Sequence, residues 1–122
     1  MDEYDQANIN AVKVLLKDKF ADVVVSYLVS AEQYVAEIGK GIENKDSVQI
    51  ENNAHPLKSS SGMMGLMKLR HIADKIENLA VEGIDSFEEG SEIYVLYNEL
   101  KRAADKGFHK LNVEMETLSS QA

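Results

Sequence analysis

Apolar residues recur every three or four positions along almost the whole chain, which is the spacing of amphipathic helices. This spacing predicts a short helix over residues 4–16 and then a longer helix whose apolar stripe reaches residue 42. The residues of that stripe are Phe20, Val24, Tyr27, Leu28, Ala31, Val35, Ile38 and Ile42. The three valines at positions 23–25 fit a strand when taken alone, but the length of the stripe favours a helix.

A polar turn over residues 43–47 separates this stripe from a third helical segment. Asn44 or Asp46 can cap the N-terminus of that helix, because both side chains accept hydrogen bonds from free backbone N–H groups. The helix is expected to end at Gly62 or Gly65, since glycine favours helix ends. Its apolar positions, at heptad spacing, are Ile50, Leu57 and Met64.

A fourth helix is predicted from about Leu66 to Gly83. Its inward positions are Leu69, Ile72, Ala73, Ile76, Leu79 and Ala80. Ser86, with Glu89 three residues later, matches a capping box and predicts the start of a fifth helix. The stripe of the fifth helix consists of Ile93, Tyr97, Leu100, Ala104, Gly107, Leu111 and Leu118.

Four long amphipathic helices joined by short turns pack best as an antiparallel four-helix bundle. No internal repeat or linker divides the chain. We therefore expect residues 1–122 to form a single all-α domain, in which the short N-terminal helix is an extra element that covers one end of the bundle.

Composition and charge narrow the possible functions. The chain has no cysteine, which excludes disulfides, thiolate metal sites and cysteine nucleophiles and fits a reducing compartment. Its formal net charge of -8 repels phosphate backbones, so no nucleic-acid partner is expected. No apolar run approaches the ~18 residues of a membrane span. These features predict a cytoplasmic protein that does not associate with membranes.

His55 differs from the other two histidines, His71 and His109, in its helical surroundings. On a wheel that steps about 100° per residue, Ser60, Ser61 and the apolar positions of the third helix fall opposite His55, which predicts that His55 faces water. The residues within about 60° of it are Val48, Glu51, Asn52, Lys58, Ser59 and Gly62. Several of these are small and leave the imidazole unobstructed, whereas larger side chains flank the other two histidines. An ordinary solvated surface histidine is the alternative interpretation.

An exposed imidazole beside a cation suits a nitrogen nucleophile that receives a phosphoryl group. Imidazole has an unperturbed pKa of about 6.5, so it is mostly neutral at pH 7 and needs no base. Lys58 can favour the neutral ring before transfer and then offset the charge of the phosphoryl oxygens. Ser59 and Gly62 make room for a second protein. Val48 and Met63 are apolar residues beside the histidine face, and they fit either a docking surface or scattered surface positions.

The stretch AHPLKSSSGMMG at residues 54–65 resembles the signature of the histidine-containing phosphotransfer (HPt) domain. The matching residues are Ala54, His55, Leu57, Lys58, Ser60, Ser61 and Gly65. The whole chain is also similar to this family in length and helix order. The resemblance implies a four-helix bundle that shuttles phosphoryl groups between an exposed histidine and the aspartates of receiver domains, with a hybrid sensor histidine kinase as a further partner. It also implies that the Mg²⁺ ion belongs to the receiver, so that this chain needs no metal or cofactor of its own.

Two positions depart from the family pattern. The family usually has glycine where this chain has Ser59, which is nearly as small. Pro56 lacks an N–H group and costs about 3 kcal/mol or more inside a helix. The third helix therefore either kinks at Pro56 or restarts there, and the apolar stripe that continues across this position favours the kink.

Three other functions compete with the phosphocarrier. A helical adaptor without chemistry explains the apolar stripes but not an outward histidine among small residues. A di-metal bundle uses inward Glu-x-x-His pairs, and no histidine here has a glutamate three residues before it. The chain lacks a glycine-rich nucleotide loop, which excludes a histidine kinase and means that the phosphoryl group comes from a partner. The sequence thus predicts a monomeric phosphocarrier that is not itself an enzyme.

Overall fold

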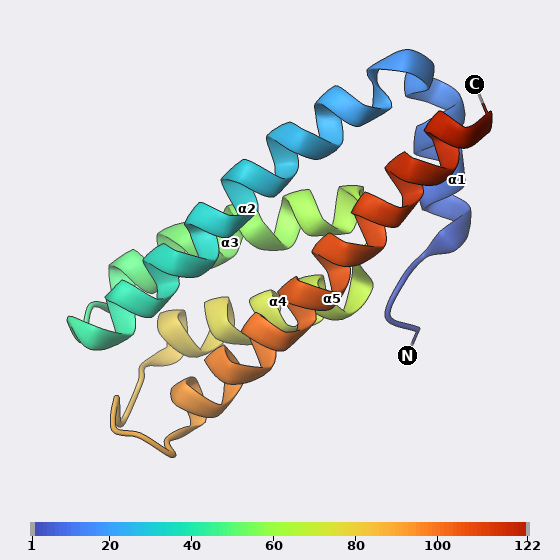
Figure 1. The fold of residues 1–122 in the computed structure, drawn as a ribbon. Coiled ribbons are helices and arrows are strands. Elements are labelled where there is room, and N and C mark those ends of the chain that lie inside the picture. Colours follow the sequence, from blue (N-terminus) through green and yellow to red (C-terminus); the bar gives the residue numbers. More distant parts are fainter. Residues whose placement is uncertain (1, 122) are drawn as a thin grey trace.

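The computed structural model describes the backbone of residues 2–121 and the side chains of residues 2–118. Helices dominate this part of the chain, which confirms the predicted all-α fold (Figure 1). The elements, in chain order, are α1 (Gln6–Leu16), the short 3₁₀ helix η1 (Lys17–Lys19), α2 (Phe20–Glu43), α3 (Ser47–Met63), α4 (Met67–Glu82) and α5 (Glu92–Gln121).

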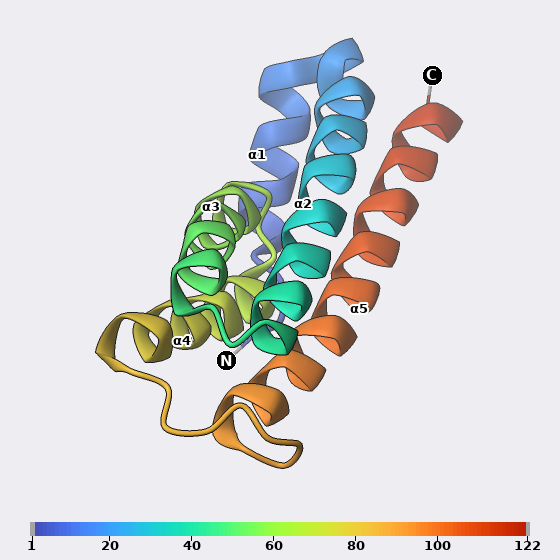
Figure 2. The same cartoon turned by 90° about the vertical axis from the view of Figure 1, so that its left-hand side faces the viewer.

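Helices α2, α3, α4 and α5 form an antiparallel four-helix bundle (Figures 1 and 2). Each helix packs against the next one along the chain, and α5 closes the bundle against α2. The core contains the inward stripes expected from the sequence. Its largest fully buried side chains are Phe20, Ile9, Ile38, Ile50, Leu57, Leu66, Leu69, Ile76, Ile93, Leu100, Leu111 and Val24. Burying one such side chain contributes roughly 1.5–3 kcal/mol, so these stripes fix how each helix is rotated about its axis.

The short helix α1 covers the end of the bundle at which α2 begins (Figure 2). Gln6 donates a hydrogen bond to Glu114 on α5 at 3.0 Å, and Lys13 forms an ion pair with the same carboxylate. The chain before α1 also crosses the α3–α4 turn, where the backbone N–H groups of Met67 and Lys68 donate to the carbonyl of Glu3 at 2.9 and 3.2 Å. The first helix therefore starts at Gln6, two residues later than predicted, because residues 3–5 bond to this turn instead.

The ends of α3 follow the predicted capping chemistry. Asp46 is the N-cap, and its side chain accepts a hydrogen bond from the backbone N–H of Gln49 at 3.1 Å. The helix then runs without a break to Met63 and includes Pro56. The alternative of a helix that restarts at Pro56 is therefore wrong. Gly65 follows in a left-handed conformation, with φ of 76°, and turns the chain toward α4.

The predicted capping box at Ser86 and Glu89 is wrong. The side-chain oxygen of Ser86 accepts a hydrogen bond from the backbone N–H of Glu88 at 3.2 Å, so it stabilises a local turn rather than a helix start. Gly90 then adopts a φ of 88°, which is incompatible with a helix at this point. The fifth helix begins only at Glu92, and the carbonyl of Ser91 accepts its first backbone hydrogen bond, from Val95.

Helix α3 places a histidine on the outside of the bundle because its apolar positions are few and lie on one side. Ile50, Ala54 and Leu57 are fully buried. Ser61 joins them on the inner face, where its hydroxyl group shares a 2.6 Å hydrogen bond with the hydroxyl group of Tyr27. With these residues turned inward, His55 lies on the opposite face of the helix.

No helix in the described part of the chain has an apolar stretch long enough to cross a bilayer.

Candidate functional site

The candidate site is centred on His55, whose side chain is 64% exposed. Its Nδ1 atom contacts Oε2 of Glu77, which projects from α4 toward α3. The Glu77 side chain is only 11% exposed, so a largely buried carboxylate holds one edge of an exposed imidazole. Glu77 is not among the residues that the sequence predicted for this site.

Lys58 lies one helical turn after His55 and binds the same carboxylate. Its Nζ atom donates to Oε1 of Glu77 at 2.5 Å and to Oδ1 of Asp74 at 3.4 Å. Glu77 therefore receives a bond on each of its oxygens, one from the histidine and one from the lysine. An ammonium group has three N–H donors, so two contacts leave Lys58 one donor for a further group.

The charges of this cluster support one another. Burial alone raises the pKa of Glu77, but the hydrogen bonds from Lys58 and His55 and the positive charge of Lys58 outweigh it and hold the pKa below its ordinary value. The hydrogen bond to Glu77 in turn raises the pKa of Lys58. At neutral pH the cluster therefore contains an ionised carboxylate and a protonated lysine.

This arrangement selects one tautomer of the neutral histidine. A carboxylate can only accept hydrogen bonds, so the ring nitrogen that faces Glu77 must carry the proton. The proton on Nδ1 leaves the lone pair on Nε2. The site thus presents an exposed nitrogen nucleophile whose ring is oriented from the opposite side by a buried anion.

The structure places the residues predicted to form the access and docking surface around His55 in different environments. Val48 and Met63 are 63% and 74% exposed. Asn52 and Ser59 are also exposed, whereas Glu51 is half-buried.

Gly62 is half-buried, and the side chain of Arg70 from α4 lies over it. A Cβ atom added at Gly62 would be only 2.8 Å from Cδ of Arg70, so the space beside this glycine is filled by the chain itself.

The remaining residues of the motif face away from the site. Ser60 donates a hydrogen bond to the carbonyl of Pro56 at 2.8 Å, and Ser61 is buried against Tyr27.

The other two histidines are both exposed. His71 lies on α4 and His109 lies on α5.

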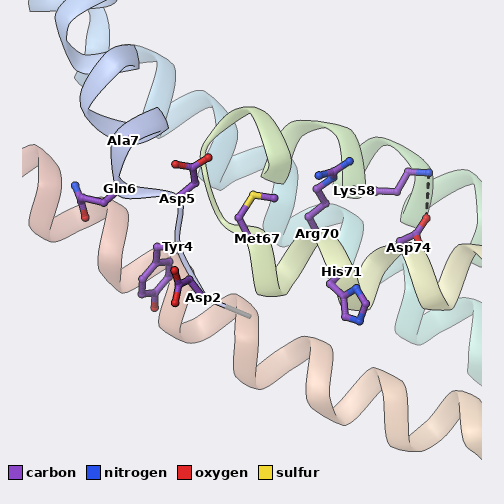
Figure 3. A pocket seen from close by; sticks show the side chains of 10 residues that line it. All are labelled: Asp2, Tyr4, Asp5, Gln6, Ala7, Lys58, Met67, Arg70, His71 and Asp74. Carbon is purple, nitrogen blue, oxygen red and sulfur yellow. Dashed lines mark hydrogen bonds and ion pairs between the residues drawn. The ribbon is translucent and has the colours of Figure 1, made fainter.

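An open pocket of about 760 Å³ borders the site where the N-terminal residues pass α4 (Figure 3). The paired side chains of Lys58 and Asp74 face each other at one edge of this pocket. Its other lining residues are Asp2, Tyr4, Asp5, Gln6, Ala7, Met67, Arg70 and His71.

Three residues of α4 that contribute to this surface were missed: Arg70, Asp74 and Glu77. They recur at spacings of four and three, so they share one face of the helix. The signal in the sequence was the position of Glu77 between the inward residues Ile76 and Ala80, where an acidic side chain interrupts an apolar stripe. A buried carboxylate requires a hydrogen-bonding or positively charged partner, so Glu77 could have been recognised from the sequence as a candidate site residue.

Comparison with known proteins agrees with this geometry. Residues 22–106 match the model of the Hpt domain family, which covers more than half of the chain. The chain therefore belongs to the Hpt domain family, as its central motif predicted.

Individual relatives extend the comparison. Over 56 residues the chain is 36% identical to multistep phosphorelay regulator 1 of Schizosaccharomyces pombe. That match covers 46% of this chain and 19% of the relative, so the chain spans about a fifth of the length of that protein. The fold is similar to the crystal structure of histidine-containing phosphotransfer protein B (HptB) of Pseudomonas aeruginosa PAO1, with a TM-score of 0.83 and 15% identity. The superposition covers 94% of this chain and 96% of that one.

Proposed function

We propose that the chain carries a phosphoryl group on Nε2 of His55, accepting it from the aspartyl phosphate of one receiver domain and donating it to the aspartate of another. The observation that carries this proposal is the exposed imidazole whose Nδ1 is held by the largely buried Glu77 carboxylate. A helical adaptor without chemistry does not account for a histidine oriented in this way.

The transfer step requires no base on this chain. The lone pair of Nε2 attacks the phosphorus atom, the N–P bond forms, and the bond between phosphorus and the aspartyl oxygen breaks. The receiver's aspartate leaves as a carboxylate. The positive charge that develops on the imidazole ring lies next to Glu77, whose carboxylate stabilises it through the hydrogen bond at Nδ1. Donation to a second receiver reverses these steps.

Lys58 has a separate role in this proposal. It starts the reaction bound to Glu77 and Asp74, and its third N–H donor can bind an oxygen of the arriving phosphoryl group. It thereby offsets the negative charge that transfer brings to the surface of the bundle. The Mg²⁺ ion that receiver domains use is supplied by the partner.

Residues around His55 form the proposed contact surface for the receiver. Ser59 is small enough to let a partner approach closely. The other contributors are Val48, Glu51, Asn52 and Met63. The chain acts as a monomer in the cytoplasm and takes its phosphoryl group from partners, with a hybrid sensor histidine kinase upstream.

The test is phosphotransfer from a panel of receiver domains labelled on their aspartates. We expect acid-labile label on the parent chain and none on His55→Gln, with both His71→Gln and His109→Gln labelled like the parent. Label that persists in His55→Gln would overturn the assignment. A parent chain that no receiver labels would favour the adaptor instead.

A further inference from the structure

Arg70 lies on the same surface as the phosphotransfer site but has no role in the proposed reaction. On α4 it shares one helix face with Asp74 and Glu77. Asp74 and Glu77 both contact Lys58 on α3. Arg70 lies against Gly62, which comes later on α3. The surface beside His55 therefore extends along the α3–α4 pair as far as Arg70.

The stem and the charge of Arg70 have different surroundings. A Cβ atom at Gly62 would lie 2.8 Å from Cδ and 3.2 Å from Nε of Arg70, so the stem occupies the space that this glycine leaves. Arg70 is nevertheless exposed. Among the side chains described for residues 2–118, no carboxylate lies within ion-pair distance of its guanidinium group. Lys58, in contrast, is bound to two carboxylates.

The position of Arg70 suits contact with a partner rather than with the phosphoryl group. Gly62 follows His55 by seven residues, which is about 10 Å along the helix axis at 1.5 Å per residue. A guanidinium group at Gly62 is therefore beyond hydrogen-bond distance of a phosphoryl group on His55, but Gly62 lies on the same side of α3 as that histidine. Its planar N–H groups match the two oxygens of a carboxylate. In a chain with a net charge of -8, this exposed cation is a local point of attraction for an acidic partner group.

We propose that Arg70 is a docking residue that binds a surface carboxylate of the receiver domain, and that Gly62 lacks a side chain so that Arg70 can lie across α3 in that position. This inference rests on the proposed phosphotransfer function. It gives Gly62 a different role from the open access for a partner that the sequence predicted.

The first test separates docking from chemistry. The partner is the receiver domain from the labelled panel that transfers fastest to the parent chain, and transfer is measured over a range of receiver concentrations and of ionic strengths. Arg70→Met keeps most of the stem and removes the charge. We expect its second-order rate constant to fall about tenfold at low ionic strength and to depend less on salt, because steering by charge acts on association. The rate at saturating receiver should stay within about twofold of the parent.

Two further variants control for charge. Arg70→Lys should recover part of the association rate, because it restores the cation without the planar donor group. Arg102→Met removes an exposed arginine from α5 and should transfer like the parent. An equal loss in Arg102→Met would trace the effect to net charge and overturn the proposal. So would an Arg70→Met variant that associates like the parent, or one that loses only its rate at saturation.

A double-mutant cycle tests the role of Gly62. Gly62→Ala should displace the flexible Arg70 side chain without lowering the melting temperature, and should slow association about as much as Arg70→Met does. In the Arg70→Met background, Gly62→Ala should then cause no further loss, because both changes remove the same contact. A further loss there would show that Gly62 serves access and would overturn this part of the proposal.

Failure of the docking role can be told apart from failure of the proposed function. Normal labelling of His55 with unaltered association in Arg70→Met removes the docking role alone. A parent chain that no receiver labels removes both.

Discussion

The contact between Glu77 and His55 predicts how much phosphotransfer depends on the orientation of the imidazole ring. Glu77→Ala removes the acceptor at Nδ1 and leaves Lys58 with Asp74 alone. A hydrogen bond to a charged group contributes about 1.5–3 kcal/mol. If that contribution is available in the transition state, its loss slows transfer by about 10- to 150-fold, at 1.36 kcal/mol per factor of ten.

A graded series of variants distinguishes orientation from charge. Glu77→Gln keeps an oxygen that can accept from Nδ1 of His55, so we expect a smaller loss, within about fivefold of the parent. Asp74→Asn weakens only the 3.4 Å contact to Lys58 and should change the rate by less than threefold. Circular dichroism and thermal melting should show that each variant remains folded.

Two measurements check this reasoning. Single-turnover transfer from a phosphorylated receiver gives the rate for each variant. ¹⁵N NMR of the histidine ring reports the tautomer, which should carry its proton on Nδ1 in the parent and lose that preference in Glu77→Ala. A folded Glu77→Ala variant that transfers within twofold of the parent would refute the proposed role of this carboxylate. A parent ring protonated on Nε2 would refute the tautomer.

The remaining predictions concern Lys58, Ser59 and Glu114. Lys58→Ala should slow transfer by about tenfold or more while the fold is retained, and an unchanged rate would show that the charge is incidental. Ser59→Tyr should melt like the parent but transfer poorly, because a bulky ring one turn from the histidine holds the receiver outside the ~3 to 3.5 Å needed for attack. Ser59→Gly should transfer at least as well as the parent, and a folded Ser59→Tyr variant with parental rates would contradict the access role. Burial raises the pKa of Glu114, but its bonds to Lys13, Lys110 and Gln6 outweigh burial and lower the pKa to about 2. Its contribution to stability is therefore complete above the ordinary value of 4.5 and is lost as the pH falls toward 2. Glu114→Gln should reduce the free energy of unfolding at pH 7 by about 2 kcal/mol and flatten its dependence on pH below 4.5 in denaturant titrations, and an unaltered pH profile would contradict this reasoning.

The sequence by itself determined the helices and the orientation of the central histidine. Both follow from the period of the apolar residues, because a helix with one apolar stripe must turn that stripe toward the core. The positions of Ile50 and Leu57 alone therefore predict that His55 points away from the bundle. The N-cap at Asp46 was also predictable from the sequence, because it depends on residues only a few positions apart.

Local sequence signals did not predict the starts of α5 and α1 correctly. Ser86 and Glu89 have the spacing of a capping box, but the chain between α4 and α5 makes a turn at Gly90 instead. A pattern of four residues contains no information about the path that a loop must take between two packed helices. The start of α1 was likewise altered by the hydrogen bonds of residues 3–5 to a turn sixty positions away in the sequence.

Only the tertiary structure decided which residues share the site. Glu77 and His55 are 22 positions apart, and whether their side chains meet depends on the rotation and offset of α4 against α3, which the packing of both stripes sets together. The same packing lays Arg70 over Gly62, so a glycine that looked like open space is covered by a side chain from the neighbouring helix. The period of one helix determines which face is outward. The neighbours of that face are determined only when two helices pack.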